Sequence, residues 1–250
     1  AEEEWQYSAP TNFLALNTTN LAAPDLADPS TNFQVATYTG NGSTQSITFG
    51  GNSNMQPDIV WMKCRSNSAA HVFQDAARGT GKALFWSNRD IEDDVTDAVT
   101  SFATDGFALG DGSELSTGDV NTSSRTYVAW NWAAGNSGSS NTDGSINTGT
   151  TYVDTTAGIS ISTYTGTGSG ATVGHGLGVT PTTVWIFPRS YSDGHIASNW
   201  ESGITVYSEK WVLSGENRAE GSTGFVTGAN STTFTIGTDV NVNQSTTTYL

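Results

Sequence analysis

The chain contains two copies of one sequence pattern, and this duplication constrains the fold more than any other feature. Each copy has a Tyr-Thr-Gly-x-Gly block, followed by a proline, a Val-Trp pair, an Arg-Ser pair and a histidine. In order, these are residues 38–42, Pro57, Val60-Trp61, Arg65-Ser66 and His71 in the first copy, and residues 164–168, Pro181, Val184-Trp185, Arg189-Ser190 and His195 in the second. The offset is 124 residues from the proline onward and 126 residues at the glycine block. A repeat of this length predicts two tandem domains rather than a solenoid.

Alternation of apolar and polar residues predicts that both copies are built from β-strands. Residues 33–38 alternate in this way, and residues 126–132 place Val128, Trp130 and Trp132 on one face. Residues 58–63 form a nearly continuous apolar run, which is typical of a central strand. The expected fold class is all-β, with two tandem antiparallel β-sandwiches of jelly-roll type and an extended N-terminal arm.

The composition along the chain gives the expected domain boundaries. We expect four parts: an extended arm or linker at 1–32, β-sandwich repeat 1 at 33–134, a flexible Gly/Ser/Thr linker at 135–156 and β-sandwich repeat 2 at 157–250. Residues 248–250 repeat residues 126–128, so the second copy lacks counterparts of Trp130 and Trp132. We therefore expect a shortened closing strand with an open edge, and a chain that is a piece of a longer polypeptide.

One further segment differs between the copies, and another recurs in both. Residues 89–101 have apolar residues at helical spacing, whereas the counterpart expected at 214–223 has none. We therefore interpret 89–101 as a variable surface loop that could hold a short helix. Residues 239–241 repeat the Asp-Val-Asn sequence of residues 119–121.

Charge and cysteine content exclude several classes of partner. The formal net charge is −15, and Lys63, Lys82 and Lys210 are the only lysines. Such a chain lacks the basic patches that bind nucleic acid or anionic membranes. The single cysteine, Cys64, cannot form an internal disulfide and is expected to be a buried small hydrophobic residue. No apolar run approaches the roughly 18 residues that a membrane-spanning helix needs, so no membrane insertion is expected.

The equivalent histidines His71 and His195 are the first candidates for catalysis. Ser66 could serve as a nucleophile and Asp75 could orient the histidine. The second copy has Asn199 in place of Asp75. This replacement favours a structural role for the histidine, and the sequence nominates no catalytic residue.

Metal and phosphate sites are not predicted either. The Asp-Gly pairs at 105–106 and 111–112 and the Asn-x-Asp-Gly stretch at 141–144 contain fragments of a calcium loop, but they are first of all turn signals. The acidic group at 92–97 could hold a hydrated cation loosely or form a solvated loop. Residues 79–83 lack the first glycine and the Ser or Thr of a phosphate-binding loop. We therefore expect no metal and no cofactor.

Tryptophan is the remaining candidate for binding. Trp61 and Trp185 are equivalent and are expected in the domain cores. Trp86, Trp200 and Trp211 are not shared between the copies, and they could stack on sugar rings or pack against a neighbouring chain. The sequence leaves the ligand-binding residues unknown.

A resemblance to a known family rests on a set of motifs spread over the first copy. These are Tyr-Thr-Gly-Asn-Gly at 38–42, Pro-Asp-Ile-Val-Trp-Met-Lys at 57–63, Arg65-Ser66, His71, Asp75, Arg78-Gly79, Ser101-Phe102, Asp105-Gly106-Phe107, residues 127–130 and Trp132. They resemble a repeated β domain of virion proteins, including tail fibre and other structural proteins, of tailed bacteriophages. Residues 7–17 resemble the end of a SPRY-like, concanavalin-type domain that precedes it in such proteins. The resemblance is weaker over 157–250, and it implies no catalytic residues.

The resemblance implies a non-enzymatic virion structural protein, either a fibre subunit or a surface-decoration subunit, with host-surface glycan attachment as an additional role. Its expected partners are copies of itself in a homo-oligomer, other virion proteins and a host-surface glycan, and many weak sites on a multimer would give avidity. Its expected location is the extracellular virion, after assembly in the host cytoplasm. The alternatives are a carbohydrate-binding module of a secreted or cell-surface protein and a glycan-cleaving enzyme with a carboxylate pair.

Overall fold

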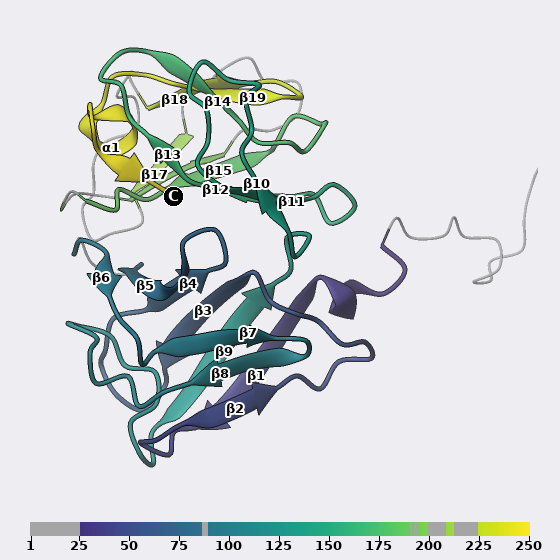
Figure 1. Cartoon of the computed structure of the whole chain (residues 1–250), viewed down its shortest axis with the longest axis vertical. Coiled ribbons are helices and arrows are strands. Elements are labelled where there is room, and N and C mark those ends of the chain that lie inside the picture. Colours follow the sequence, from purple (N-terminus) through teal and green to yellow (C-terminus); the bar gives the residue numbers. More distant parts are fainter. Residues whose placement is uncertain (1–25, 87–89, 191, 193–194, 200–208, 213–224) are drawn as a thin grey trace, which may run out of the picture.

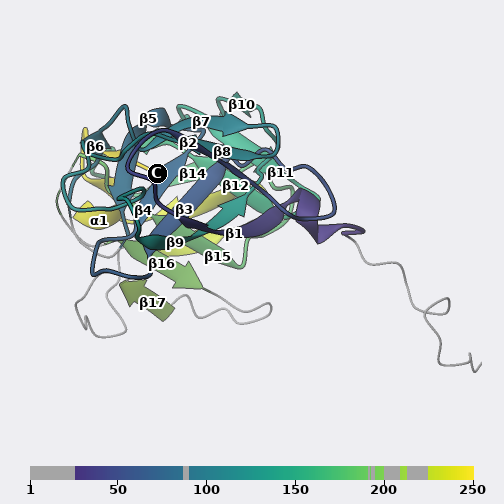
Figure 2. The same ribbon diagram turned by 90° about the horizontal axis from the view of Figure 1, so that it is seen from below.

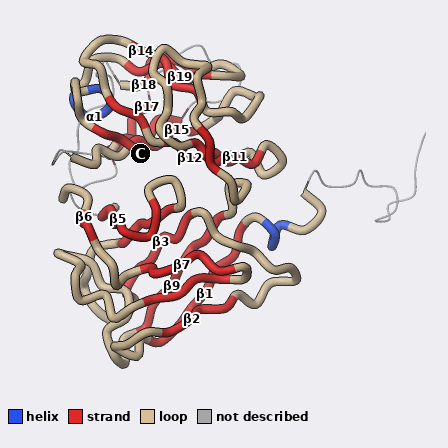
Figure 3. Tube along the Cα trace, viewed as in Figure 1, coloured by secondary structure: helices blue, strands red, loops and turns tan. Residues whose placement is uncertain are grey.

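The structure is a computed structural model that describes residues 26–86, 90–190, 192, 195–199, 209–212 and 225–250. Within these residues the regular secondary structure is almost entirely antiparallel β-strand, as the alternation predicts (Figure 3). The exceptions are a short 3₁₀ helix, η2 (Pro29–Thr31), and a four-residue helix, α1 (Val240–Asn243). The two sequence copies form two β units, which lie one above the other in Figure 1 and overlap in Figure 2.

The first unit is a sandwich of two sheets. Its strands are β1 (Phe33–Thr39), β2 (Gln45–Thr48), β3 (Ile59–Cys64), β4 (Val72–Asp75), β5 (Gly79–Phe85), β6 (Asp93–Asp94), β7 (Val99–Ala103), β8 (Gly106–Leu109) and β9 (Thr126–Trp132). One sheet has the order β1-β9-β3-β4-β5-β6 and the other has the order β2-β8-β7. The predicted central strand is therefore confirmed, since β3 lies between β9 and β4.

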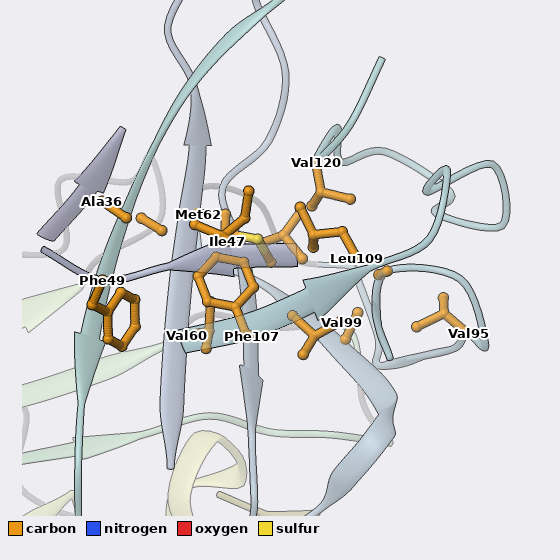
Figure 4. Packing of buried hydrophobic residues seen from close by; sticks show 14 of the residues in the cluster. Ala36, Ile47, Phe49, Val60, Met62, Val95, Val99, Phe107, Leu109 and Val120 are labelled. Atoms are coloured by element: carbon orange, nitrogen blue, oxygen red, sulfur yellow. The ribbon is translucent and has the colours of Figure 1, made fainter. Parts of the chain in front are cut away.

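The core of the first unit lies between these two sheets (Figure 4). Val60 and Met62 from β3 meet Phe107 and Leu109 from β8, and all four side chains are at most 1% exposed. Cys64, at the end of β3, is buried with its thiol free, as expected.

The second unit repeats the strand pairings of the first in shorter pieces. Its strands are β10 (Gly138–Ser139), β11 (Thr151–Asp154), β12 (Ile159–Ser162), β13 (Tyr164–Thr165), β14 (Ala171–Gly174), β15 (Thr183–Ile186), β16 (Ile196–Asn199), β17 (Glu209–Val212), β18 (Val226–Ala229), β19 (Thr233–Ile236) and β20 (Thr248–Tyr249). The order β14-β19-β18 matches β2-β8-β7, and β15-β16-β17 matches β3-β4-β5. The pair β13-β20 matches the pairing of the end of β1 with the start of β9.

A stacked tyrosine pair fixes the same corner of both units. Tyr38 and Tyr127 have ring centroids 5.0 Å apart and an interplanar angle of 15°, and Tyr164 and Tyr249 have the same two values. Tyr38 and Tyr164 donate their hydroxyl protons to buried backbone carbonyls at 2.8 and 2.7 Å. Burial raises the pKa of both hydroxyls well above the ordinary value, so both stay protonated as donors.

The carbonyl acceptors correct one part of the sequence comparison. They belong to Val120 and Val242, and Asn121 and Asn243 follow them in the chain. Each asparagine Nδ2 donates to two carbonyls in the same way, so Asn243 is the counterpart of Asn121. The predicted match of residues 239–241 to residues 119–121 is therefore wrong by two residues. Asp239 is the N-cap of the short helix α1 and accepts the Asn241 N–H.

Residues 135–156 do not form the flexible linker that their composition suggests. They contain β10 and β11, and β11 pairs with β12. Ile146 is buried in the core of the second unit. The polar side chains satisfy one another, since the hydroxyl oxygens of Thr148 and Thr151 lie 2.8 Å apart and Thr148 Oγ1 accepts the Asn141 N–H at 2.7 Å. A segment rich in Thr and Asn is therefore ordered here by side-chain hydrogen bonds together with the burial of Ile146.

The expectation of a surface loop with a short helix at 89–101 is also wrong over the described residues. This stretch contains β6 and enters β7, and Val95, Ala98 and Val99 are at most 1% exposed in the first core. The error came from the comparison with residues 214–223, because the counterpart of β7 is β18 at 226–229. Within the arm, residues 1–25 lie outside the described residues, while Asp28 caps η2 by accepting the Ser30 N–H at 2.9 Å.

Candidate functional site

A row of aromatic side chains covers the outer face of the six-stranded sheet. We call Phe33, Trp132, Trp130, Trp61 and Trp86 the aromatic strip. Neighbouring ring centroids are 5.1 Å apart for Phe33 and Trp132, 5.1 Å for Trp61 and Trp130, and 4.5 Å for Trp61 and Trp86, which are stacked. Strand alternation produces the strip, because every second residue of β1, β3 and β9 points away from the core. Exposure falls along it from 39% at Phe33 to 6% at Trp86.

The buried end of the strip packs against the second unit. Phe187 lies 4.8 Å from Trp86 and 5.7 Å from Phe73, and Trp185 meets Trp86 edge-on at 4.7 Å. A third apolar cluster, built from both units, therefore joins them. Its buried members are Ile59, Phe73, Leu84, Trp86, Ala134, Ile161, Phe187 and Leu250.

The prediction that Trp61 and Trp185 lie in the domain cores is wrong. Trp61 is half-buried in the strip, and Trp185 is 43% exposed. The core positions of β3 are Val60 and Met62. Because β3 is apolar on both faces, alternation alone could not decide which face is the interior. Of the tryptophans not shared between copies, Trp86 lies in the strip, whereas Trp200 and the Trp211 side chain lie outside the described part of the chain.

The histidine-centred catalytic group is not assembled. His71 Nδ1 accepts the indole N–H of Trp61 at 2.9 Å. Ser66 Oγ accepts the backbone N–H of Thr126, and Asp75 is paired with Arg78. The three candidate residues thus have different partners. His71 instead fixes the orientation of Trp61 in the strip, and burial lowers the pKa of its imidazole.

His195 is more deeply buried than His71 and lies in the second unit where that unit packs against the first. Its ring is 1% exposed and lies 4.8 Å edge-on from Phe187. Burial lowers the pKa of His195 to about 4, although a hydrogen bond to the Trp86 backbone acts in the opposite direction. Its Nδ1 is buried and has no hydrogen-bond partner among the described residues. At neutral pH this histidine is therefore an uncharged packing residue between the units.

The acidic group at 92–97 is a set of structural contacts, and its first member links the units. Glu92 accepts hydrogen bonds from Arg189 Nε at 2.7 Å and from Arg78 Nη1 at 2.9 Å, and its backbone N–H donates to the Arg189 carbonyl. Burial alone would raise the pKa of Glu92, but the two guanidinium groups lower it overall. Asp94 pairs with Lys82. The interpretation of this stretch as a solvated loop is therefore wrong at Glu92, whose side chain is 8% exposed.

The remaining candidate motifs are turns and strand ends. Gly106 and Gly112, in the two Asp-Gly pairs, have φ of 117° and 73°, values that favour glycine. Gly79 opens strand β5 rather than a helix, so no phosphate-binding loop forms there. Among the described residues, no group of three or more His, Cys, Asp or Glu is placed to hold a metal ion. No helix in the described part of the chain is long and apolar enough to cross a membrane.

A cavity of about 340 Å³ adjoins the strip at the junction of the two units. Trp132, Ile59 and Phe73 line it from the first unit. The facing wall consists mainly of residues of β12 and β15 and of the segments beside these strands. Its volume lies within the range of small-ligand sites.

Comparison with known proteins gives a family match. Residues 28–250 match the family model described as "Domain of unknown function (DUF7483)". The chain belongs to this family. The DUF7483 match includes both β units and the segment between them, and the family description assigns no activity. No curated protein and no solved structure matches the chain.

In this DUF7483 member, the sequence analysis did not predict that the outer face of the six-stranded sheet packs against the second unit. The alternation of β9 correctly placed Trp130 and Trp132 on one face. Phe33 and Val35, which are 39% and 51% exposed, extend that face across β1. The available signal was that β1, β3 and β9 all carry large apolar residues on both faces, which predicts a second buried surface in addition to the core.

Proposed function

We propose that this chain is a non-enzymatic structural subunit of a bacteriophage virion, in a fibre or a surface decoration, and that the exposed end of the aromatic strip contacts host-surface glycans. The motif resemblance and the two tandem β units support the structural role. The observation that carries the glycan contact is the group of Phe33, Trp132 and Val35 at the exposed end of the strip. Aromatic rings that keep one face accessible to solvent can stack on sugar rings.

The architecture supports display rather than catalysis. Two β units joined through an apolar cluster can present the strip, and repeated copies in an oligomer would add avidity to weak single sites. The acidic and histidine candidates near the junction make structural contacts instead. Glu92 binds two arginines, and His71 holds Trp61.

Polysaccharide affinity gels test the glycan contact directly. Wild-type chain should migrate more slowly in gels that contain a bacterial surface polysaccharide than in plain gels. Phe33→Ala should reduce this retardation at least about threefold, since stacking on one ring contributes on the order of 1 kcal/mol. Val179→Ala is the matched control, because Val179 is an exposed apolar residue at 61% that lies outside the strip. Equal retardation of both variants would contradict the assignment of the strip.

Sedimentation velocity tests the structural role. A fibre or decoration subunit should be a stable oligomer at micromolar concentration, because most such assemblies are symmetric homo-oligomers. A carbohydrate-binding module of a secreted or cell-surface protein is the second candidate, and the same aromatic strip favours it. That candidate predicts glycan retardation by a monomer. A monomer that binds glycan would therefore replace the first proposal with the second.

A further inference from the structure

Two cationic side chains adjoin the aromatic strip on the outer face of the six-stranded sheet. Trp61 and Lys63 of β3 both point to this face, because alternate residues of a strand share one side. Arg65 follows β3 directly, and its N–H donates to the Thr126 carbonyl at 2.7 Å, so the pairing with β9 and the alternation continue there. Trp61 is paired with Trp130 of β9. The lysine and the arginine therefore follow the two indoles at steps of about 7 Å along the strands.

Threonine hydroxyls border the same face on strand β1. Thr37 and Thr39 are exposed and alternate with core residues, so they lie on the side that carries Val35. Thr39 is paired with Thr126 of β9, which is half-buried. Indole rings, cations and hydroxyl groups thus share one surface. Aromatic rings stack on sugar rings, hydroxyls exchange hydrogen bonds with sugar hydroxyls, and lysine and arginine bind carboxylates.

Lys63 and Arg65 have no carboxylate partner among the described residues. The other four basic side chains that the structure describes each form a salt bridge with Asp or Glu: Arg78, Lys82, Arg125 and Arg189. Lys63 Nζ donates to the carbonyls of Cys64 and Ala69 at 2.7 and 3.1 Å, which orient the ammonium group without neutralising it. Arg65 is exposed. In a chain of net charge −15, these two neighbouring cations form a local site for an anion.

The second unit shows what the same positions contain where they are covered. Phe187 is the counterpart of Lys63, and it is 3% exposed because it packs against the first unit. Arg189 is the counterpart of Arg65, and Glu92 accepts hydrogen bonds from its guanidinium at 2.7 and 2.8 Å. The covered surface therefore has an apolar residue and a neutralised arginine. The first unit instead keeps two cations whose counter-charge is available to a ligand.

We propose that the outer face beside the two indoles is a subsite for an acidic sugar, a hexuronic acid whose carboxylate binds Lys63 and Arg65. The sugar ring stacks on Trp130, which is half-buried, and its hydroxyls bond to Thr37. This inference rests on the proposed glycan contact and names the class of sugar that the same face takes. A glycan that stacks on the exposed end of the strip reaches the subsite across Val35, which is paired with Trp130.

Charge favours a hexuronic acid over the other ligands that aromatic rings and cations can bind. A neutral sugar gains nothing from the two cations. Nucleic acid gains affinity with each phosphate that is neutralised, so two cations in a strongly acidic chain are too few for it. One carboxylate, by contrast, is satisfied by one or two charge-assisted hydrogen bonds. Repulsion from the remaining negative charge of the chain is screened beyond about 8 Å at physiological ionic strength.

Affinity gels that contain charged and neutral forms of the same polymer test the subsite. The uronate polymers polygalacturonate, alginate and hyaluronan are each compared with their own methyl ester, which has the same backbone without the charge. At least one of them should retard the wild-type chain about threefold more than its ester does. Lys63→Met and Arg65→Gln should each remove most of this difference. Lys82→Met is the control, because it removes the same charge from a lysine that is paired with Asp94.

The possible results separate the subsite from the glycan contact on which it rests. Equal retardation by every uronate polymer and its ester overturns the subsite, as does a carboxylate-dependent retardation that survives both Lys63→Met and Arg65→Gln or that Lys82→Met reduces equally. In those cases, retardation that Phe33→Ala reduces leaves the glycan contact standing. A wild-type chain that no polysaccharide retards contradicts the glycan contact and the subsite together. If Lys63→Met does not fold, Arg65→Gln decides, since Arg65 is exposed.

Discussion

His195 should make the folded chain less stable as the pH falls from 6.5 toward 4. Burial lowers the folded-state pKa of His195 to about 4, whereas the unfolded chain takes up a proton near the ordinary value of 6.5. Between these values the unfolded state holds one more proton, so stability falls with pH and the loss is complete below pH 4. Each pH unit in this window costs about 1.4 kcal/mol. Lowering the pH from 7.5 to 4.5 should therefore remove about 2.5 kcal/mol through this residue.

Urea unfolding followed by tryptophan fluorescence at pH 7.5 and 4.5 measures this loss. His195→Gln is the informative variant, because a glutamine side chain can donate to the Trp86 backbone but does not titrate. Other groups contribute to the pH dependence of both proteins and cancel in the difference. Wild type should lose about 2.5 kcal/mol more than the variant. His71→Gln, at the equivalent half-buried position, should change the pH dependence less. Equal losses in wild type and His195→Gln would refute the reasoning.

Three further predictions concern stability and are checked by chemical or thermal unfolding. Tyr38→Phe and Tyr164→Phe should each lower the free energy of unfolding by about 1 kcal/mol, because each leaves one buried carbonyl without its donor; values that differ by more than about twofold would argue against equivalent corners. Glu92→Gln should lower the free energy of unfolding by about 3 kcal/mol, because it leaves two arginines without their shared carboxylate. Asp94→Asn is the control and should lower it by under about 0.5 kcal/mol, because the Asp94 side chain is 82% exposed. Gly40→Ala should destabilise by more than about 2 kcal/mol, since its Cβ would lie 2.3 Å from a backbone oxygen; a folded variant of near wild-type stability would show that this turn can move.

The sequence was sufficient to predict the architecture because strand patterns are local. Alternation in residues 33–38 and 126–132 identified β1 and β9, and the apolar run at 58–63 identified β3. The duplication was visible from residue spacing alone, and the repeated tyrosine corner shows why the Tyr-Thr-Gly-x-Gly block recurs. A Cβ at Gly40 or Gly166 would lie 2.3 Å from a backbone oxygen of the facing loop.

Which face of a strand lies inside was not predictable in the same way. Trp61 and Val60 are neighbours in β3, and burial of either side is compatible with the sequence. The choice depends on what covers the second face, and this is a contact between residues far apart in the chain, such as Trp86 and Phe187.

Polar segments raise a similar difficulty. The order of residues 135–156 depends on specific side-chain hydrogen bonds, which composition does not reveal.

The apolar cluster shared by the two units makes the solubility of each half depend on the presence of the other. Phe73 and Trp86 of one half pack with Phe187 and Leu250 of the other. Either half expressed alone would therefore expose a large hydrophobic surface. The molecule should therefore melt as a single calorimetric peak rather than in two steps. Loss of either copy would leave the apolar face of the other uncovered and prone to aggregate.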